Sequence, residues 1–347
     1  MTRITRALVL ALGGVVALTL AGDAFAAYKP TLTASTDGPK TTVRVFGSPS
    51  DLGSAHILIL VPKGFTASLG NDGQTIGTAE AKATAADLGG ATLPLSGTIQ
   101  ARSGSGMFTV SGASVSLSAA AKQCTGTTTH AGFWVLSLSA AGQSIEVPIF
   151  VDAGPAGGPS YTLTLCLSPS DVPNNNPQRA PFGAKLFDAT VTVNGVFRAP
   201  AGEKRWSLIA TPYGAGTGKP NIPGTIEAQA LDRGPAKASL SARRAGKKRA
   251  SIVAAFFTTG TPSPIGGASV VVLAGRKVVA RGKTNSGGQF RAVVTLPTAT
   301  AALTARIAAP GRNLGASACT ASQPPVPCVG ATLAGFSGTS NKVVVRT

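Results

Sequence analysis

The chain has 347 residues and a formal net charge of +18, and 43% of its residues are hydrophobic whereas only 13% are charged. With 43 Gly and 24 Pro, this composition excludes a coiled coil, a highly charged disordered chain and a typical α/β enzyme. It is typical of many short strands joined by turns, and the length leaves room for two domains of ordinary size. We therefore predict an all-β protein.

The first 26 residues have the pattern of an export signal. Two arginines precede the apolar residues 7–20, and Ala24-Phe25-Ala26 matches the small-x-small rule for cleavage. We predict cleavage after Ala26 and an extracellular protein, either free or associated with the cell wall; a retained N-terminal anchor is the alternative. No later stretch reaches the run of about 18 apolar residues that a transmembrane helix needs, so we expect no membrane insertion after removal of the signal.

Residues 27–235 are predicted to form an elaborated N-terminal β-sandwich, because Thr and Ser alternate with apolar residues along several short runs. The predicted strands are residues 41–46, 55–61, 96–101, 115–117, 133–139, 145–151, 161–167 and 189–197. Only residues 79–88 have a pattern that could form a helix. The sequence leaves open whether this half is one domain or two, and we favour one.

Four cysteines form an even set in a chain with an export signal, which favours disulfides over free thiols or a catalytic nucleophile. They are Cys124, Cys166, Cys319 and Cys328. Three pairings are possible, and proximity in sequence favours pairing the first with the second and the third with the fourth. On the chain-entropy model each bridge would stabilise the fold by about 2.5 to 4 kcal/mol, with the larger gain for the longer loop.

The N-terminal half carries the few titratable groups on which catalysis could depend. A carbohydrate-active enzyme or other hydrolase is the alternative function, and it needs a concave site that collects at least two of six side chains. These are Glu146, Glu203, Glu227, Asp152, Asp171 and His130. No G-x-S-x-G motif occurs, and the glycine-rich residues 214–220 lack the first Gly and the Ser or Thr of a phosphate-binding loop. We therefore predict a non-enzymatic protein. His56 and His130 lack the spacing of zinc ligands, so we expect no metal and no cofactor.

The charge of the chain changes abruptly near residue 235. Residues 27–235 contain 14 Lys and Arg and 12 Asp and Glu, whereas residues 236–347 contain 15 Lys and Arg and no Asp or Glu. Asp232 is the last carboxylate side chain, and Gly234-Pro235 punctuates the backbone beside it. We place a domain boundary at residue 235. The second domain has no His either, so it offers neither carboxylate nor imidazole side chains for acid–base catalysis.

Residues 236–347 are predicted to form a small sandwich of seven strands. The predicted strands are residues 237–242, 249–258, 268–274, 276–281, 289–296, 301–308 and 341–346. Within residues 289–296, Phe290, Val294 and Leu296 would face inward while Arg291 faces outward. The later strands repeat this alternation, so that one face is apolar and the other carries cations.

Nine cations of this half are predicted to lie on outward faces or in the turn between its first two strands. They are Arg243, Arg244, Lys247, Lys248, Arg249, Arg291, Arg306, Lys342 and Arg346. Unopposed cations raise the local concentration of anions, which makes them candidate contacts for an anionic cell-envelope polymer. The alternatives are that they only protect strand edges and keep the domain soluble, that the partner is another surface protein, or that the protein is a spacer without a ligand.

We expect no specific nucleic-acid partner, because this basic half has no Tyr or Trp to stack on bases. The sequence does not predict the oligomeric state.

One stretch of the basic half is similar to a known group of modules. Residues 267–272 (GASVVV) and 282–290 (GKTNSGGQF) resemble the core of bacterial immunoglobulin-like and transthyretin-like (carboxypeptidase regulatory-like) modules. The resemblance covers about residues 237–312. It implies an immunoglobulin-like sandwich used as a spacer, adhesion or binding module in secreted and surface proteins, usually without catalysis.

The sequence departs from these modules over residues 313–340, an unusually long connection before the last strand, which Cys319 and Cys328 would staple. In the N-terminal half, residues 61–65 (VPKGF) and 211–213 (TPY) resemble uncharacterised exported actinobacterial proteins. That second resemblance implies no function.

Overall fold

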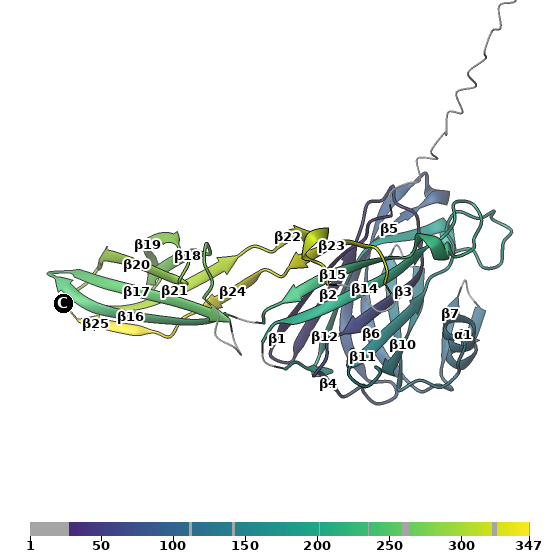
Figure 1. Cartoon of the computed structure of the whole chain (residues 1–347), viewed down its shortest axis with the longest axis horizontal. Coiled ribbons are helices and arrows are strands. Elements are labelled where there is room, and N and C mark those ends of the chain that lie inside the picture. The colour runs from purple at the N-terminus through teal and green to yellow at the C-terminus, as the bar shows by residue number, and fades with distance from the viewer. Residues whose placement is uncertain are drawn as a thin grey trace, which may run out of the picture.

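The computed structural model describes residues 28–110, 113–140, 143–200, 202–234, 236–258, 264–320 and 325–346. The predicted export signal lies outside the described residues. Regular structure in this part of the chain is almost entirely strand, with one α-helix, α1 (Leu117–Thr125), so the all-β prediction is confirmed. Figure 1 shows a larger and a smaller group of strands arranged end to end.

The larger group is built on one sheet of 13 strands, which we call the large sheet, in the order β1-β2-β12-β5-β6-β9-β10-β11-β3-β14-β15-β23-β22. Its strands are β1 (Thr31–Asp37), β2 (Lys40–Phe46), β3 (Ser54–Val61), β5 (Thr75–Ala85), β6 (Ala91–Arg102), β9 (Gly132–Ala140), β10 (Gln143–Ala153), β11 (Tyr161–Cys166), β12 (Ala184–Asn194), β14 (Lys204–Pro212), β15 (Ile226–Asp232), β22 (Arg312–Gly315) and β23 (Cys328–Leu333). Neighbours are antiparallel, except that β23 lies parallel to β15.

Short elements decorate the large sheet. They are the paired strands β4 (Thr66–Ala67) and β13 (Phe197–Arg198), the hairpin β7 (Met107–Val110) and β8 (Ala113–Ser116), and the 3-10 turns η1 (Ala86–Leu88), η2 (Pro181–Gly183), η3 (Ile222–Gly224) and η4 (Ala316–Ala318). The hairpin leads directly into α1, which packs on the outer side of β9 and β10 through a small apolar cluster.

The large sheet curls until its first strand meets its last ones. The Thr36 hydroxyl on β1 donates a hydrogen bond to Asp232 Oδ2 on β15 at 2.6 Å. The Thr332 hydroxyl on β23 donates to the main-chain oxygen of Leu32 on β1 at 2.5 Å. The two halves of the sheet therefore face each other as in a sandwich, and their inward side chains form a common core.

Two glycines allow the backbones to approach closely where the sheet bends. A Cβ atom at Gly77 on β5 would lie 2.2 Å from the main-chain oxygen of Thr192, and one at Gly97 on β6 would lie 1.7 Å from that of Ser137. No other residue fits such a contact, so glycine is required at both positions.

Large aromatic side chains occupy the core of the large sheet. Trp134, Trp206 and Tyr213 are 1%, 0% and 8% exposed. Phe65 packs edge-on against Trp206, with ring centroids 5.3 Å apart, and Phe197 packs against Trp134 at 6.1 Å. These side chains are structural, and none of the three is displayed on the surface for stacking on a partner.

The smaller group is a sandwich of two sheets, which we call the distal sandwich. One sheet contains β16 (Ala236–Gly246), β17 (Arg249–Thr258) and β20 (Gln289–Thr295). The other contains β19 (Lys277–Lys283), β18 (Ser269–Ala274) and β21 (Thr300–Ala309), with both β24 (Phe336–Thr339) and β25 (Val343–Arg346) paired to β21. Phe290, Val294 and Leu296 are buried and Arg291 is exposed, as the alternation predicted.

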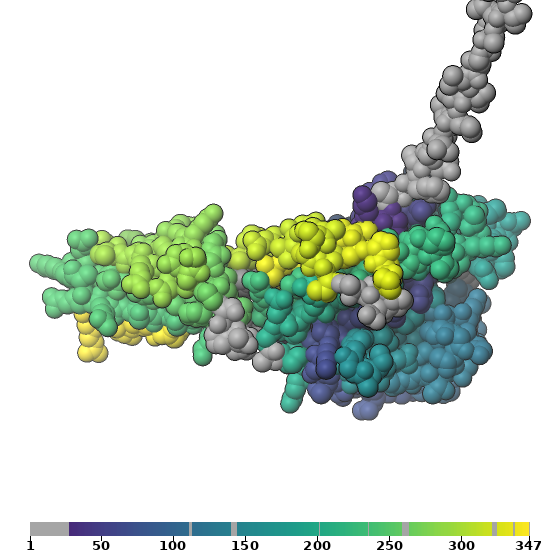
Figure 2. Space-filling model, in the orientation of Figure 1, coloured from purple at the N-terminus to yellow at the C-terminus, as the bar shows by residue number. Residues whose placement is uncertain are grey.

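The chain passes between the large sheet and the distal sandwich more than once. After β21, residues 312–333, which we call the return segment, run back to the large sheet as β22, η4 and β23, and the chain then re-enters the sandwich as β24. Figure 2 shows this segment in yellow-green over the large sheet. These residues were assigned to the second domain as a long stapled loop, and that assignment is corrected: they complete the first. The edge of β15 offers unpaired backbone groups, and β23 satisfies them. With β24, the described residues of the distal sandwich form eight strands and not seven.

Two local predictions need adjustment. Residues 79–85 are not helical: β5 continues to Ala85, with Ala79, Ala81 and Ala83 buried and Glu80 exposed between them, a period of two that suits a strand, and only the short 3-10 turn η1 follows it. The strand predicted over residues 115–117 is present as the end of β8, but it stops one residue earlier, because the Ser116 hydroxyl accepts a hydrogen bond from the Ala119 N–H and caps α1 at Leu117.

Candidate functional site

Five of the predicted cations lie on the hairpin that joins β16 and β17. They are Arg243, Arg244, Lys247, Lys248 and Arg249, and all five are exposed. Lys248 has a positive φ of 55° at the turn. Side chains on so short a hairpin lie close together in space, so the sequence alone was sufficient to group these five cations.

Folding adds three further cations to the same end of the sandwich. Arg346 lies opposite Thr300 at the start of β21, and the Leu296 N–H before that strand donates to the main-chain oxygen of Lys248 at 2.8 Å. The turn between β18 and β19 is held nearby, because the Gly275 N–H donates to the Ala302 oxygen at 3.1 Å. That turn displays Arg276 and Lys277, both exposed.

We call these eight side chains the cationic tip. Its members are Arg243, Arg244, Lys247, Lys248, Arg249, Arg276, Lys277 and Arg346. The hairpin and the C-terminus lie at the end of the molecule remote from the large sheet (Figure 1). Arg276 and Lys277 were missed as candidates, although a turn after Gly275 in a basic domain was a usable signal.

The remaining three candidates do not join the tip. Arg291 lies midway along β20 and donates to Gln289 Oε1 at 2.8 Å. Arg306 lies on the outer face of the other sheet, beside Thr339 of β24, and Lys342 is exposed just before β25. Because Arg291 and Arg306 lie on opposite faces, one flat surface cannot contact both.

The cations of the distal sandwich have no acidic partners within it. Among the described residues, every ion pair lies in the larger group of strands. Residues 236–347 contain no Asp or Glu. No acidic side chain of the described distal sandwich therefore opposes the field of the tip, and solvent ions screen it over about 8 Å at physiological ionic strength.

The six groups named for a hydrolase are mostly dispersed. Glu146 accepts hydrogen bonds from the Thr109 N–H and the Ser137 hydroxyl. Glu203 pairs with Arg233 at 3.2 Å. Glu227 accepts from the Gln229 amide, and Asp171 accepts from the Gly216 N–H. Only His130 and Asp152 meet, with Nδ1 and Oδ2 2.9 Å apart.

His130 lies between Thr125 and Asp152 in a hydrogen-bonded array. Its Nε2 lies 3.1 Å from the Thr125 hydroxyl, as in a nucleophile–His–acid triad. That hydroxyl also lies 2.9 Å from the main-chain oxygen of Ala121 and 3.2 Å from that of Thr127, so these carbonyls compete with the imidazole for its single proton. The imidazole is fully buried between Phe133 and Phe150. No substrate can reach it in this conformation, and the array ties α1 to the sheet.

The disulfides follow the pairing that proximity favoured. Cys124–Cys166 joins α1 to β11, with Cα atoms 5.8 Å apart, and Cys319–Cys328 closes the loop of the return segment at 6.4 Å. His56 lies opposite Cys166 in the strand register, and burial lowers the pKa of its imidazole. His56 and the first disulfide cluster within 4.8 Å, but oxidised sulfurs are not thiolate ligands, so this cluster lacks the donors of a metal site.

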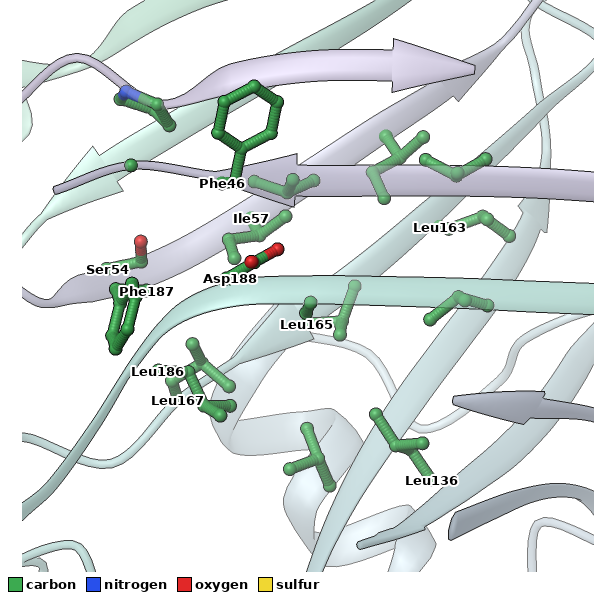
Figure 3. Close-up of a pocket in the computed structure, with 18 of the residues that line it drawn as sticks. Phe46, Ser54, Ile57, Leu136, Leu163, Leu165, Leu167, Leu186, Phe187 and Asp188 are labelled. Atoms are coloured by element: carbon green, nitrogen blue, oxygen red, sulfur yellow. The ribbon is translucent and has the colours of Figure 1, made fainter. Parts of the chain in front are cut away.

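An apolar cavity of about 120 Å³ lies between the facing halves of the large sheet. Figure 3 shows Leu136, Leu163 and Leu165 among its walls, with Phe46, Ser54 and Phe187 at one end. At about 24 cal/mol per Å³, a void of this size would lower stability by about 3 kcal/mol if it stayed empty. The sequence carried no signal for it, because it depends on how far apart the two halves lie.

No described helix is long and apolar enough to cross a membrane. No protein-family model matches the chain, and a comparison with curated proteins finds no match. The interpretation of the cationic tip and the cavity therefore depends on their own geometry and chemistry.

Proposed function

We propose that this is a secreted, non-enzymatic binding protein whose distal sandwich contacts an anionic cell-envelope polymer through the cationic tip. The observation that carries the proposal is the convergence of three separate chain segments, the β16–β17 hairpin, the β18–β19 turn and β25, on one exposed end that has eight cations. Solubility or edge protection alone would not require cations to collect at the end of the molecule.

The rest of the protein is suited to act as a support that holds the cationic tip. The large sheet is anchored to the distal sandwich by the return segment, so the tip is held by more than a single linker. The two disulfides and the predicted export signal fit an oxidising extracellular environment. The packing of a three-stranded sheet on a five-stranded one supports an immunoglobulin-like module, which would serve as a spacer or adhesion module.

The proposal is tested with the chain lacking residues 1–26 and with inorganic polyphosphate as the polyanion probe. The tip variant carries Arg243→Gln, Arg244→Gln, Lys247→Gln, Lys248→Gln and Arg249→Gln. The control variant removes the same charge elsewhere, through Lys29→Gln, Lys40→Gln, Lys63→Gln, Arg198→Gln and Lys219→Gln, all exposed on the larger group of strands.

We expect the unaltered chain to bind polyphosphate at low salt and to lose affinity steadily as salt rises, because bound polymer releases counterions at each cation contact. The tip variant should bind at least about tenfold more weakly and show a shallower salt dependence, whereas the control should change little. Equal losses in both variants would show that only net charge matters, and absence of binding at low salt would refute the proposal.

A further inference from the structure

The walls of the apolar cavity come from strands on both halves of the large sheet. Val43 on β2 and Ala189 on β12 form one side, and Ile59 on β3, Ile149 on β10 and Leu163 on β11 form the other. Val43 and Ala189 are short side chains, in contrast to Phe46 and Phe187 on the same two strands. A single larger side chain at one of these two positions could therefore have filled this side of the cavity.

The cavity is closed at one end by aromatic rings. Trp134 and Phe197 line that end, and Phe197 in turn contacts Phe65 and Tyr161, with ring centroids 6.3 and 6.1 Å apart. The Trp134 indole N–H donates to the main-chain oxygen of Leu69 at 2.9 Å, which holds the ring in place. A ligand therefore could not pass through this end.

The other end of the cavity is a polar mouth. The Tyr28 hydroxyl and the Ser54 hydroxyl are hydrogen-bonded at 2.7 Å, and burial raises the pKa of Tyr28 to about 12. Half-buried Lys185 donates to the main-chain oxygen of Asp51 at 2.7 Å. Figure 3 shows Asp188 and Ser54 at this end.

The charges at the mouth favour neither kind of ion. Lys185, Asp51 and Asp188 all line the cavity, and Asp188 is already held by a two-point contact with Arg44. Both signs are therefore present, so an entering carboxylate or ammonium would meet a like charge as well as an opposite one. The apolar side chains of the wall behind the mouth cannot replace the water molecules that an ion would lose on entering. A neutral hydroxyl can instead share hydrogen bonds with Tyr28 or Ser54 without that penalty.

We infer that the cavity binds a small neutral apolar molecule, a short alkyl chain or a single aromatic ring with at most a hydroxyl at its end. Apolar cavities of about 150 Å³ remain dry and take up benzene, and this one is of similar size. The ligand enters at the Tyr28–Ser54 mouth with its apolar portion directed toward Trp134. This site is separate from the cationic tip and does not depend on polyanion binding.

The test uses the chain lacking residues 1–26 and three probes of equal chain length: 1-hexanol, hexanoate and hexylamine. Calorimetry and amide chemical shifts should show 1-hexanol bound with a dissociation constant of about 1 mM or less. The two charged probes should bind at least about tenfold more weakly. Shifts should concentrate on β2, β11 and β12 and leave the distal sandwich unmoved.

A cavity-filling variant supplies the matched comparison. Ala189→Phe adds a ring inside the cavity, and Thr190→Phe adds the same ring one residue along β12 on the outer face. We expect Ala189→Phe to weaken 1-hexanol binding at least about tenfold and Thr190→Phe to leave it unchanged. Ala189→Leu, a smaller filling, is used if the first variant does not fold.

Three results would overturn the inference. Absence of 1-hexanol binding to the unaltered chain would show that the space is a packing void. Equal binding of all three probes would show that the mouth does not discriminate charge. Retention of binding in the folded Ala189 variant would place the ligand elsewhere.

Discussion

Asp232, the last carboxylate side chain in the sequence, closes the seam at which the curled sheet meets itself. Its Oδ2 accepts the Thr36 hydroxyl from β1 at 2.6 Å and lies 3.8 Å from Lys204 Nζ on β14. Its Oδ1 accepts the Gly234 N–H at 2.7 Å, at the exit toward the distal sandwich. The side chains of Asp232 and Lys204 are only 3% and 5% exposed. Asp232→Asn should therefore remove the charge and leave a buried cation unpaired.

The structure sets the size of the effect. At 3.8 Å and an effective dielectric constant of about 20, the lost attraction is about 4 kcal/mol. Rearrangement of the side chains around Lys204 would recover part of this, so we expect Asp232→Asn to lower the free energy of unfolding by about 3 kcal/mol. Lys204→Met in the same chain should restore much of the loss, because a buried pair replaced by neutral groups is often tolerated.

The assay is urea unfolding at neutral pH followed by tryptophan fluorescence. Both tryptophans, Trp134 and Trp206, lie in the core of the large sheet, so the signal reports this part of the molecule. The two single variants and the double variant form a cycle, for which we expect a coupling of about 2 kcal/mol. A loss below about 1 kcal/mol for Asp232→Asn, or strict additivity in the cycle, would refute the argument that the pair closes the seam.

Two further predictions concern the large sheet. The Arg44 guanidinium hydrogen-bonded to Asp188 lowers the pKa of that carboxyl. The ion pair therefore stabilises the fold above the ordinary carboxyl pKa of about 3.9, and this contribution is lost as pH falls through the lowered value. The free energy of unfolding should fall less steeply with acid for Asp188→Asn than for the unaltered chain, and identical pH profiles would contradict this. Gly97→Ala places a Cβ 1.7 Å from a facing carbonyl oxygen and should cost at least about 3 kcal/mol in urea unfolding, whereas Gly330→Ala, whose Cβ meets nothing closer than 4.0 Å, should cost less than about 1 kcal/mol.

Local patterns were sufficient for much of this protein. Alternation along residues 289–296 identified both the strand and its buried face, and the Gly-rich turns separated it from its neighbours. Spacing also favoured the observed cysteine pairing, because the nearest cysteines along the chain are the least restricted in meeting. The five cations of the β16–β17 hairpin were grouped for the same reason.

Alanine was the main source of error within single elements. In β5 the inward positions are mostly Ala, a residue that favours helix where nothing else intervenes. Neighbouring strands β12 and β6 supply backbone partners along the whole of β5, and this pairing outweighs the local preference. The opposite error was made at α1. Its first residue, Leu117, continues the alternating pattern of the preceding strand, so a strand was predicted there and the helix was missed.

The sequence by itself determined the strand content, the inward face of most strands and the separation of charge, because these depend on residues a few positions apart. Only the tertiary structure decided that the return segment joins β15, that Arg276, Lys277 and Arg346 reach the cationic tip, and that a cavity separates β2 and β12 from β10 and β11. A period of two specifies which face of a strand is buried but not which strand lies beside it. Partners distant in the chain are chosen by the edges and volumes that remain when the whole sheet has curled.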